Sequence, residues 1–453
     1  MDDTIAAIST PIGEGGIAII RISGPNALVL ADRIFHSRDG RVSEFPSHTL
    51  HFGTIGRDGE TIDQVMLGVL HGPRTYTKED TIEINCHGGV LTARKTLALC
   101  LQSGARLAEP GEFTKRAFLN GRLDLTQAEA VMDLIRAKSD RAHTAAVHEL
   151  EGYLSKKIDR ARDKLITILA HIEAHIDFPE DDIAPETRET LLRETEVVLD
   201  FIRALLATAR EGKILREGIS VAIVGRPNVG KSSLMNALIG SDRSIVTSVP
   251  GTTRDTIEEN ACISGVLFRL TDTAGIRKTR GAAEQIGVER SRKALDISEI
   301  VLLVLDSSKS LSAADRELAK QIEGNRLLLV LNKADLSTRL RLPDDMAAFD
   351  CVKVSATIGT GLDALRDKLV GLAYSGKVGT TDVDVAINER QNGLLKYSEN
   401  YLTETIHSFN SNRPLEIIAQ QLRHSLNVIS EITGKIAAED ILSKIFSTFC
   451  IGK

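Results

Sequence analysis

Aromatic residues are scarce in this chain of 453 residues: they make up 4% of it, and tryptophan is absent. This scarcity argues against a surface on which unpaired RNA bases stack. The formal net charge is −6, and the chain contains no long tract of Lys or Arg. The net charge therefore gives the chain no overall electrostatic attraction to nucleic acid, although a local basic patch could exist.

Membrane-spanning and secretory signals are also missing. No apolar run approaches the length of a membrane span, and the chain opens with Met1-Asp2-Asp3 rather than with a cationic signal region. The cysteines show no C-x-x-C spacing, which argues against a disulfide framework or a zinc site and favours a reducing compartment. They are Cys86, Cys100, Cys262, Cys351 and Cys450. We expect a soluble, cytoplasmic protein.

A glycine-rich motif at residues 225–232 is the most informative stretch that is present. It reads G-x-x-x-x-G-K-S, follows the apolar run 219–224 and precedes a helical pattern at 233–238. Glycines let backbone N–H groups turn onto phosphate oxygens, and the helix N-terminus adds positive potential. Lys231 would reach the β- and γ-phosphates, and the Ser232 hydroxyl would bind Mg²⁺. Taken alone, the motif could still be a chance match on an ordinary strand–turn–helix.

Three further motifs follow in order, each at the end of an apolar strand-like run. They are Asp272-Thr273-Ala274-Gly275, Asn332-Lys333-Ala334-Asp335 and Ser355-Ala356. An open α/β sheet binds its ligand at the C-terminal ends of its strands, where these motifs would gather. The ordered set therefore predicts a nucleotide-binding domain.

The Asp335 carboxylate indicates which base is bound. An ionised carboxylate only accepts hydrogen bonds, and guanine offers it two adjacent donors that adenine lacks. A site built for such donors can reject an analogue without them by about 10⁴ or more. We therefore predict GTP rather than ATP.

The chain length predicts two to four domains. Residues 1–118 form an α+β pattern, with strand-like runs at 4–9, 16–22, 65–70 and 81–85 and helical patterns at 27–35 and 90–102. Residues 217–377 hold the nucleotide motifs.

The flanking segments 119–216 and 378–453 are helical in pattern. A capping box is expected at Thr126–Glu129, and a long helix is expected to bury one apolar stripe: Leu154, Ile158, Ala161, Leu165, Leu169 and Ile172. A further helix is expected at about 186–211. Both flanks would form one helical domain with the α/β P-loop domain inserted, although two separate helical domains remain an alternative.

Several segments resemble one family. They are Asp3–Ala7, Ile20–Gly24, Gly111–Asn120, Ala170–Pro179 and the C-terminal Phe449-Cys450-Ile451-Gly452-Lys453. Together with the GTP motifs, they make nearly the whole chain similar to the MnmE (TrmE) family of tRNA-modification GTPases. The resemblance implies a homodimer with an α+β folate-binding-like N-terminal domain, an α-helical bundle domain and an inserted α/β P-loop GTPase domain.

The resemblance also implies a reaction and its partners. With an MnmG-type FAD protein, in a heterotetramer, the family installs an aminomethyl or carboxymethylaminomethyl group at carbon 5 of the wobble uridine of certain tRNAs. A folate, 5-formyl- or methylene-tetrahydrofolate, supplies the one-carbon unit.

Two usual aids to GTP hydrolysis are missing. Ile276 stands where Ras-like enzymes have a water-orienting Gln, and no arginine finger is evident. The resemblance implies K⁺ in place of the finger, Thr253 with Ser232 on Mg²⁺, and catalytic roles for Lys231 and Glu284. The implied K⁺ ligands are Asn228, Thr247, Val249 and Thr252. From the sequence alone, Glu284 could instead be a solvated surface charge.

The expected nucleotide contacts come from the four motifs and from the switch segment that the resemblance adds. They are Asn228, Val229, Gly230, Lys231, Ser232, Ser233, Thr247, Ser248, Val249, Pro250, Gly251, Thr252, Thr253, Asp272, Thr273, Ala274, Gly275, Asn332, Lys333, Ala334, Asp335, Ser355 and Ala356.

A folate site is implied at Arg21, Glu83, Arg122 and Lys453, with Arg122 standing where the family often has Lys. Without the resemblance, Arg21 and Glu83 could be a plain cross-strand ion pair. Cys450 is a functional candidate near the folate, or else a cysteine packed at a helix end.

Two other functions remain open at the level of sequence. One is a ribosome-assembly or other regulatory GTPase that acts as a binding switch, and the other is a dynamin-type scaffold. The chain shows neither an evident C-terminal RNA-binding domain nor a basic amphipathic membrane segment, which argues against both.

Overall fold

A computed structural model describes residues 3–177, 186–240, 258–272, 298–320, 322, 326–374, 385–436 and 438–453. The chain divides into two compact units. The first comprises Met1–Met132, Glu149–Val198 and Tyr397–Lys453, and the second comprises Asp133–His148 and Leu199–Lys396. Among the described residues, no helix has the length and apolar character needed to cross a bilayer.

The N-terminal part of the first unit is a seven-stranded sheet in the order β3-β4-β5-β6-β2-β1-β7. Its neighbouring strands are antiparallel, except that β1 and β7 are parallel. The strands are β1 (Ile5–Ile8), β2 (Ile17–Ser23), β3 (Phe35–His36), β4 (Thr49–Arg57), β5 (Glu60–Leu70), β6 (Thr81–His87) and β7 (Arg106–Leu107). The expected strands in this part are confirmed, whereas β3, β4 and β7 were not predicted.

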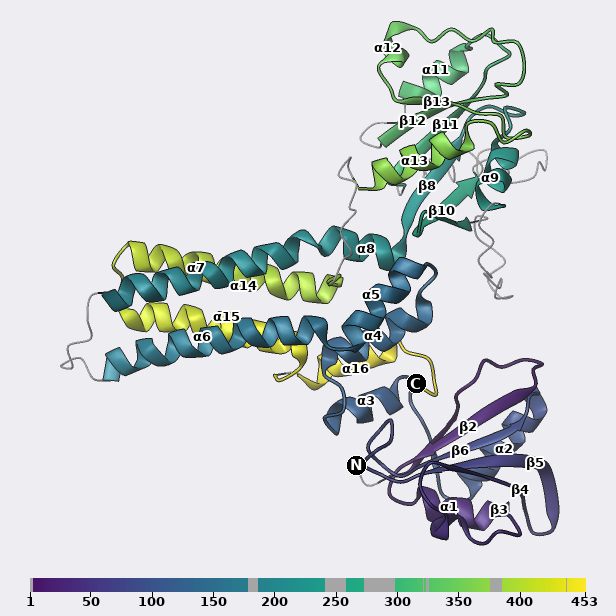
Figure 1. Ribbon diagram of the computed structural model, residues 1–453, viewed down its shortest axis with the longest axis vertical. Helices are drawn as coiled ribbons and strands as arrows, with labels where there is room; N and C mark the ends of the chain where they lie inside the picture. The colour runs from purple at the N-terminus through teal and green to yellow at the C-terminus, as the bar shows by residue number, and fades with distance from the viewer. Residues whose placement is uncertain are drawn as a thin grey trace. The chain divides into compact units, whose positions relative to one another are not determined.

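One face of this sheet is covered by helices α1 (Ala27–Ile34) and α2 (Val90–Gln102) (Figure 1). Ala18, Ile20 and Ile22 of β2 point into the core on that side. Successive strand residues point to opposite faces, so Arg21 lies on the other face, directly opposite Glu83 of β6. The alternation along β2 thus places a charged pair on the face opposite α1 and α2.

Helices from both flanks of the inserted domain pack together in the first unit. They are α3 (Glu112–Leu119), α4 (Leu125–Arg136), α6 (Tyr153–Asp177), α7 (Glu186–Ala207), α14 (Glu389–Asn410), α15 (Leu415–Thr433) and α16 (Glu439–Ser447). α15 lies along α6 and α16 packs against α3 (Figure 1). All six residues of the expected apolar stripe on α6 are buried. This packing of α15 against α6 favours one helical domain over two separate ones.

Two helix boundaries differ from the sequence-based expectation. The capping box of α4 is formed by Asp124 and Gln127, because each side chain binds the backbone N–H of the other at 3.0 Å. The prediction of Thr126 as the cap was wrong: its hydroxyl donates to Asp124 Oδ1 instead. The helix expected at 186–211 is two helices, α7 and α8 (Ala209–Glu217). The short α5 (Asp140–Leu150) follows α4 in the chain.

The second unit is built on a six-stranded sheet in the order β13-β12-β11-β8-β10-β9. Its strands are parallel except for β9. They are β8 (Ile219–Val224), β9 (Glu258–Ile263), β10 (Val266–Asp272), β11 (Ile300–Asp306), β12 (Arg326–Asn332) and β13 (Cys351–Lys353). The described helices around them are α9 (Lys231–Ile239), α11 (Ala313–Lys320), α12 (Asp344–Ala347) and α13 (Leu362–Ala373).

The central strands of this sheet are buried on both faces. Val221 and Ile223 of β8 belong to one core with α9 and α13, whereas Ala222 and Val224 belong to a second core with α11 and α12. Strands buried on both sides read as continuous apolar runs rather than alternating ones. This explains why 219–224 and 327–331 were easy to identify in the sequence.

A candidate nucleotide-binding site and a second polar cluster

The loop between β8 and α9 requires glycine at both ends. Gly225 has φ 146°, and a Cβ there would come within 2.5 Å of the Val304 carbonyl oxygen. Gly230, at φ 96°, is the N-cap of α9, and a Cβ on it would collide with Asn332 Nδ2. Because L-residues rarely adopt such φ values, only glycine lets this loop turn tightly against the neighbouring strands.

Lys231 lies within the curve of the loop. Its Nζ donates to the carbonyl oxygens of Gly225 at 2.8 Å and of Arg226 at 2.9 Å, and the residue is 5% exposed. Burial lowers the pKa of Lys231, an effect that the negative charge of Asp272 opposes. The ammonium group is therefore held at the N-terminus of α9, where a phosphate would bind.

Ser232, in the first turn of α9, meets Asp272 at the end of β10. The Ser232 hydroxyl donates to Asp272 Oδ2 at 2.9 Å, and Asp272 is the last residue of β10. Hydroxyl and carboxylate oxygens are the hard ligands that Mg²⁺ prefers. The structure thus brings together two of the predicted residues in an arrangement that fits a magnesium ion.

Asn332 connects the phosphate loop to the base-side loops. Its Nδ2 donates to the Val229 carbonyl at 2.9 Å, and its Oδ1 accepts from the backbone N–H of Ala356 at 3.1 Å. The residue is 2% exposed. One buried amide therefore fixes three predicted segments relative to one another.

Asp335 and Ser355 also meet. The Ser355 hydroxyl donates to Asp335 Oδ1 at 2.6 Å, and no hydrogen bond to Oδ2 is found within the described ranges. The backbone N–H of Ala334 donates to the carbonyl of Val354 at 3.0 Å, which holds the two loops side by side. One carboxylate oxygen thus remains for the donors of a base.

A residue that sequence reasoning missed is Asp306, the last residue of β11. Lys333 Nζ donates to Asp306 Oδ2 at 2.7 Å and to the Asn228 carbonyl at 2.9 Å. Burial alone would raise the pKa of Asp306, but hydrogen bonds from Lys333 and Ser308 outweigh it and lower the pKa to about 2. Its position at the C-terminal end of a strand, as for Asp272, was the signal available in the sequence.

Part of the predicted nucleotide site falls outside the described residues. These positions are Thr247, Ser248, Val249, Pro250, Gly251, Thr252, Thr253, Thr273, Ala274, Gly275, Ile276 and Glu284. The expectations for K⁺ coordination by the switch segment and for water positioning therefore stay predictions.

A second polar cluster surrounds Arg21 and Glu83 in the first unit. Their side chains form the cross-strand ion pair at 2.8 Å that the sequence allowed. The Arg21 guanidinium lies 5.7 Å from the centroid of the Phe113 ring and 5.9 Å from that of Tyr76. Arg122 lies over the same Tyr76 ring at 4.7 Å and donates to its carbonyl oxygen at 3.0 Å. Two cations thus share one aromatic neighbour.

The C-terminal residues come to this cluster from the far end of the chain. The backbone N–H of Phe113 donates to the Lys453 carbonyl at 3.2 Å, and that of Gly111 donates to the Cys450 carbonyl at 3.3 Å. The Ser9 hydroxyl donates to the carbonyl of Gly452 at 3.2 Å. The side chain of Cys450 is exposed, so the alternative of a cysteine packed at a buried helix end is wrong.

Tyr76 was missed by sequence reasoning. Its hydroxyl shares a hydrogen bond of 2.9 Å with Thr114, and burial raises the pKa of that hydroxyl. Tyr76 lies in the loop between β5 and β6, and in a chain so poor in aromatics an aromatic among charged residues was the only signal.

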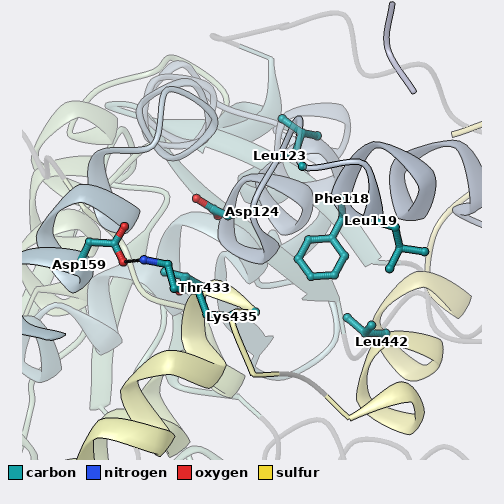
Figure 2. Close-up of a pocket in the computed structure, with 10 residues that line it drawn as sticks. Phe118, Leu119, Leu123, Asp124, Asp159, Thr433, Lys435 and Leu442 are labelled. Atoms are coloured by element: carbon teal, nitrogen blue, oxygen red, sulfur yellow. Dashed lines mark hydrogen bonds and ion pairs between the residues drawn. The ribbon is translucent and has the colours of Figure 1, made fainter. Parts of the chain in front are cut away.

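A groove of about 480 Å³ lies elsewhere in the first unit, among α3, α6, α15 and α16 (Figure 2). Its lining residues are Phe118, Leu119, Gly121, Leu123, Asp124, Asp159, Thr433, Gly434, Lys435 and Leu442. None of the predicted site residues lines it, so the candidate sites do not depend on it.

Comparison with known sequences decides the family. The family model described as the MnmE helical domain matches residues 125–450, and that described as the GTP-binding protein TrmE N-terminus matches residues 4–122. The chain belongs to the MnmE family of tRNA modification GTPases. The tRNA modification GTPase MnmE of Listeria innocua is 47% identical over 455 residues, covering 100% of this chain and 99% of that protein. The protein of the same name from Enterococcus faecalis is 46% identical, covering 100% and 98%.

Membership of the MnmE family makes the chain a GTP hydrolase of tRNA modification, and GTP the nucleotide of the P-loop site. The other GTPase functions left open by the sequence are thereby set aside. A crystal structure of Era from Aquifex aeolicus bound to GDP and AlF4⁻ covers 40% of this chain and 66% of that one, at 24% identity and a TM-score of 0.28. That likeness is too low to add to the assignment.

Proposed function

We propose that this GTPase is stimulated by K⁺ and works with an MnmG-type FAD protein on certain tRNAs. Together they would install an aminomethyl or carboxymethylaminomethyl group at carbon 5 of the wobble uridine, with 5-formyl- or methylene-tetrahydrofolate as the source of the carbon. The observation that carries the proposal is the cluster in which Arg21, Arg122 and the C-terminal segment meet around Tyr76 and Phe113.

We propose two metal ions, Mg²⁺ and K⁺, in the GTP site. The Ser232 hydroxyl and the Asp272 carboxylate fit Mg²⁺, and we propose Thr253 as its further ligand. Asn228 is exposed at φ 66°, and its side chain has no hydrogen bond within the described ranges, so its amide oxygen is available for K⁺. Bound cations would supply the positive charge that an arginine finger supplies elsewhere.

In this proposal, side chains of the chain itself bind the phosphates, recognise the base and position water. Lys231 holds the β- and γ-phosphates, and Asp335, oriented by Ser355, accepts hydrogen bonds from the guanine base. Glu284 would position water, with Thr247, Val249 and Thr252 completing the K⁺ site. The remaining predicted nucleotide contacts belong to the same proposal.

The Arg21 cluster fits a folate. A folate tail carries carboxylates, which guanidinium groups such as Arg21 and Arg122 bind well. Its pterin ring carries N–H donors, for which the Glu83 carboxylate is an acceptor. We assign Lys453 to the same site because its backbone is bonded to Phe113. Cys450, exposed beside it, remains a functional candidate.

A homodimer is supported by the face of the N-terminal sheet that lies opposite α1 and α2. Apolar side chains lie exposed there, namely Ile17, Leu50, Phe52 and Met66. Phe52 and Met66 are direct cross-strand neighbours. An exposed apolar patch of this kind marks an interaction surface.

We further propose domain boundaries at 1–118, 119–216, 217–377 and 378–453.

The test is reconstitution with tRNA, the FAD partner and the folate in KCl and in NaCl at equal ionic strength. We expect faster GTP turnover and more modified wobble uridine, measured by mass spectrometry, in KCl. The substitution Lys231→Ala should abolish both, and Asn228→Ala should abolish the difference between the salts. Asn412→Ala is the matched control, because Asn412 has a similar left-handed backbone at φ 51°. Equal turnover in both salts by the unaltered protein would refute the K⁺ part.

The folate part has its own readout. Binding of 5-formyl-tetrahydrofolate, measured by calorimetry, should be lost in Arg21→Gln without a change in GTP turnover. Undiminished folate binding in that variant would remove the proposed site.

A further inference from the structure

Helix α6 carries its charged side chains along two different edges. Its apolar stripe, from Leu154 to Ile172, is buried. On the exposed side, Lys156, Arg160 and Lys164 recur at four-residue steps, and residues four apart on a helix lie above one another. Lys157 lies beside Arg160 and Lys164 at three- and seven-residue spacing. We call Lys156, Lys157, Arg160 and Lys164 the α6 basic stripe.

Two acidic residues of α6, Asp159 and Glu173, are turned away from this stripe, whereas Asp163 lies beside it, three residues after Arg160. Asp159 forms an ion pair with Lys435 at 2.5 Å (Figure 2), and Glu173 forms one with Arg423 at 2.7 Å. Arg423 belongs to α15 and Lys435 to the turn that follows it, so both acids face the neighbouring helix or its end. Asp163 is paired with Arg162 at 3.2 Å. Every acid within residues 153–173 therefore already has a cationic partner.

Among the described residues, the side chains of the α6 basic stripe have no acidic partner. In the part of the chain that the structure describes, Lys157, Arg160 and Lys164 form no ion pair, and Lys156 donates to the Glu151 carbonyl and lies over the Tyr153 ring. Lys156, Arg160 and Lys164 are exposed and Lys157 is half-buried, so cations gather on this side of the helix in a protein whose formal net charge is −6. An ordinary solvated helix face mixes charges of both signs. Within residues 153–173 the one acid beside this stripe, Asp163, is already paired with Arg162, so the stripe keeps a positive excess.

We propose that the α6 basic stripe binds the phosphodiester backbone of the tRNA. The inference rests on tRNA being the substrate and adds the surface that holds it. Lys156 and Lys164 are eight residues apart, about 12 Å along the helix axis, a length over which one nucleic acid strand presents about three phosphates. Contacts of this kind position an RNA without reading its sequence. A membrane surface is a poorer match, because a membrane-binding helix needs an exposed apolar face and that of α6 is buried.

The salt dependence of tRNA binding tests the proposal. The dissociation constant of a fluorescent tRNA for the full chain is measured by anisotropy over a series of KCl concentrations. Each lost phosphate contact lowers the slope of log affinity against log salt by about 0.7–0.9. The double variant Arg160→Gln, Lys164→Gln should therefore lower the slope by about 1.4–1.8, whereas Arg160→Lys, Lys164→Arg, which keeps both charges, should retain it.

The control removes the same charge elsewhere in the same unit. Arg94 and Lys95 are exposed on α2, and Arg94→Gln, Lys95→Gln should leave the slope unchanged. Circular dichroism and melting temperature check that each variant folds. An equal loss of slope in the control, or an unchanged slope in the stripe variant, would overturn the proposal while leaving the tRNA function intact. Absence of tRNA binding by the unaltered chain would overturn both the stripe and the tRNA part of the proposed function.

Discussion

Replacing Asn332 by alanine should weaken GTP binding although Asn332 is almost completely buried. Its amide makes two hydrogen bonds in opposite directions, to the Val229 carbonyl in the phosphate loop and from the Ala356 N–H in the base-side loop. Alanine keeps the backbone of β12 but removes both bonds. The two loops then lose the side chain that holds them at a fixed separation.

The size of the effect follows from the two backbone groups left without a partner. Each such group costs about 1–3 kcal/mol, so the pair should cost about 2–6 kcal/mol in total. Because GTP binds only when both loops are in place, much of that cost appears in the binding equilibrium. At 1.4 kcal/mol for each factor of ten, the dissociation constant should rise by about 10- to 100-fold.

The assay is a fluorescence titration with a labelled GTP analogue, accompanied by circular dichroism. Asn410→Ala, at an exposed position of α14, is the control for loss of an asparagine and should leave the affinity unchanged. A rise of less than twofold for Asn332→Ala in a folded protein would refute the reasoning. It would show that nucleotide itself, rather than Asn332, sets the separation of the loops.

Three further predictions concern residues that the sequence did not single out. Tyr76→Leu removes the ring beneath Arg122 and should weaken 5-formyl-tetrahydrofolate binding by about 3- to 10-fold. Tyr76→Phe keeps the ring and should retain most of the affinity. Equal affinities of the two variants in calorimetry would contradict a role for the ring. The lowered pKa of Asp306 means that its pairing with Lys333 contributes stability above pH about 4, which is lost as the pH falls towards 2; Asp306→Asn should lower the melting temperature at pH 7 and flatten its fall over that acid range. Arg116 is fully buried among three carboxylates, so Arg116→Met should cost about 3–5 kcal/mol in urea unfolding, and a loss below about 1 kcal/mol would show that the carboxylates re-pair or become hydrated.

The nucleotide site was predictable because its signals are local. A phosphate loop needs glycine at positions 225 and 230, and a sheet buried on both faces needs unbroken apolar strands, so both leave short, contiguous patterns. The order of the motifs then places their polar residues at one edge of the sheet. Prediction from local patterns failed at the N-terminus of α4, where two residues of different type can each act as the N-cap. Both Asp124 and Thr126 can cap a helix, and only the packing around α4 selects Asp124.

The sequence by itself determined the GTP-binding domain, the long amphipathic helices and the resemblance to a family, since each depends on residue types at short spacing. Tertiary structure alone decided which distant residues meet. Lys453 reaches Phe113 because the chain returns to the N-terminal sheet, and Asp306 meets Lys333 because their strands are neighbours. Along α6 acids and bases are interspersed in sequence, and packing against α15 and the turn after it pairs Asp159 and Glu173 with cations there and leaves the basic stripe without them. The charge of such a helix edge depends on which side chains are neutralised by neighbouring helices. The spacing of residues along α6 alone does not reveal those neighbours.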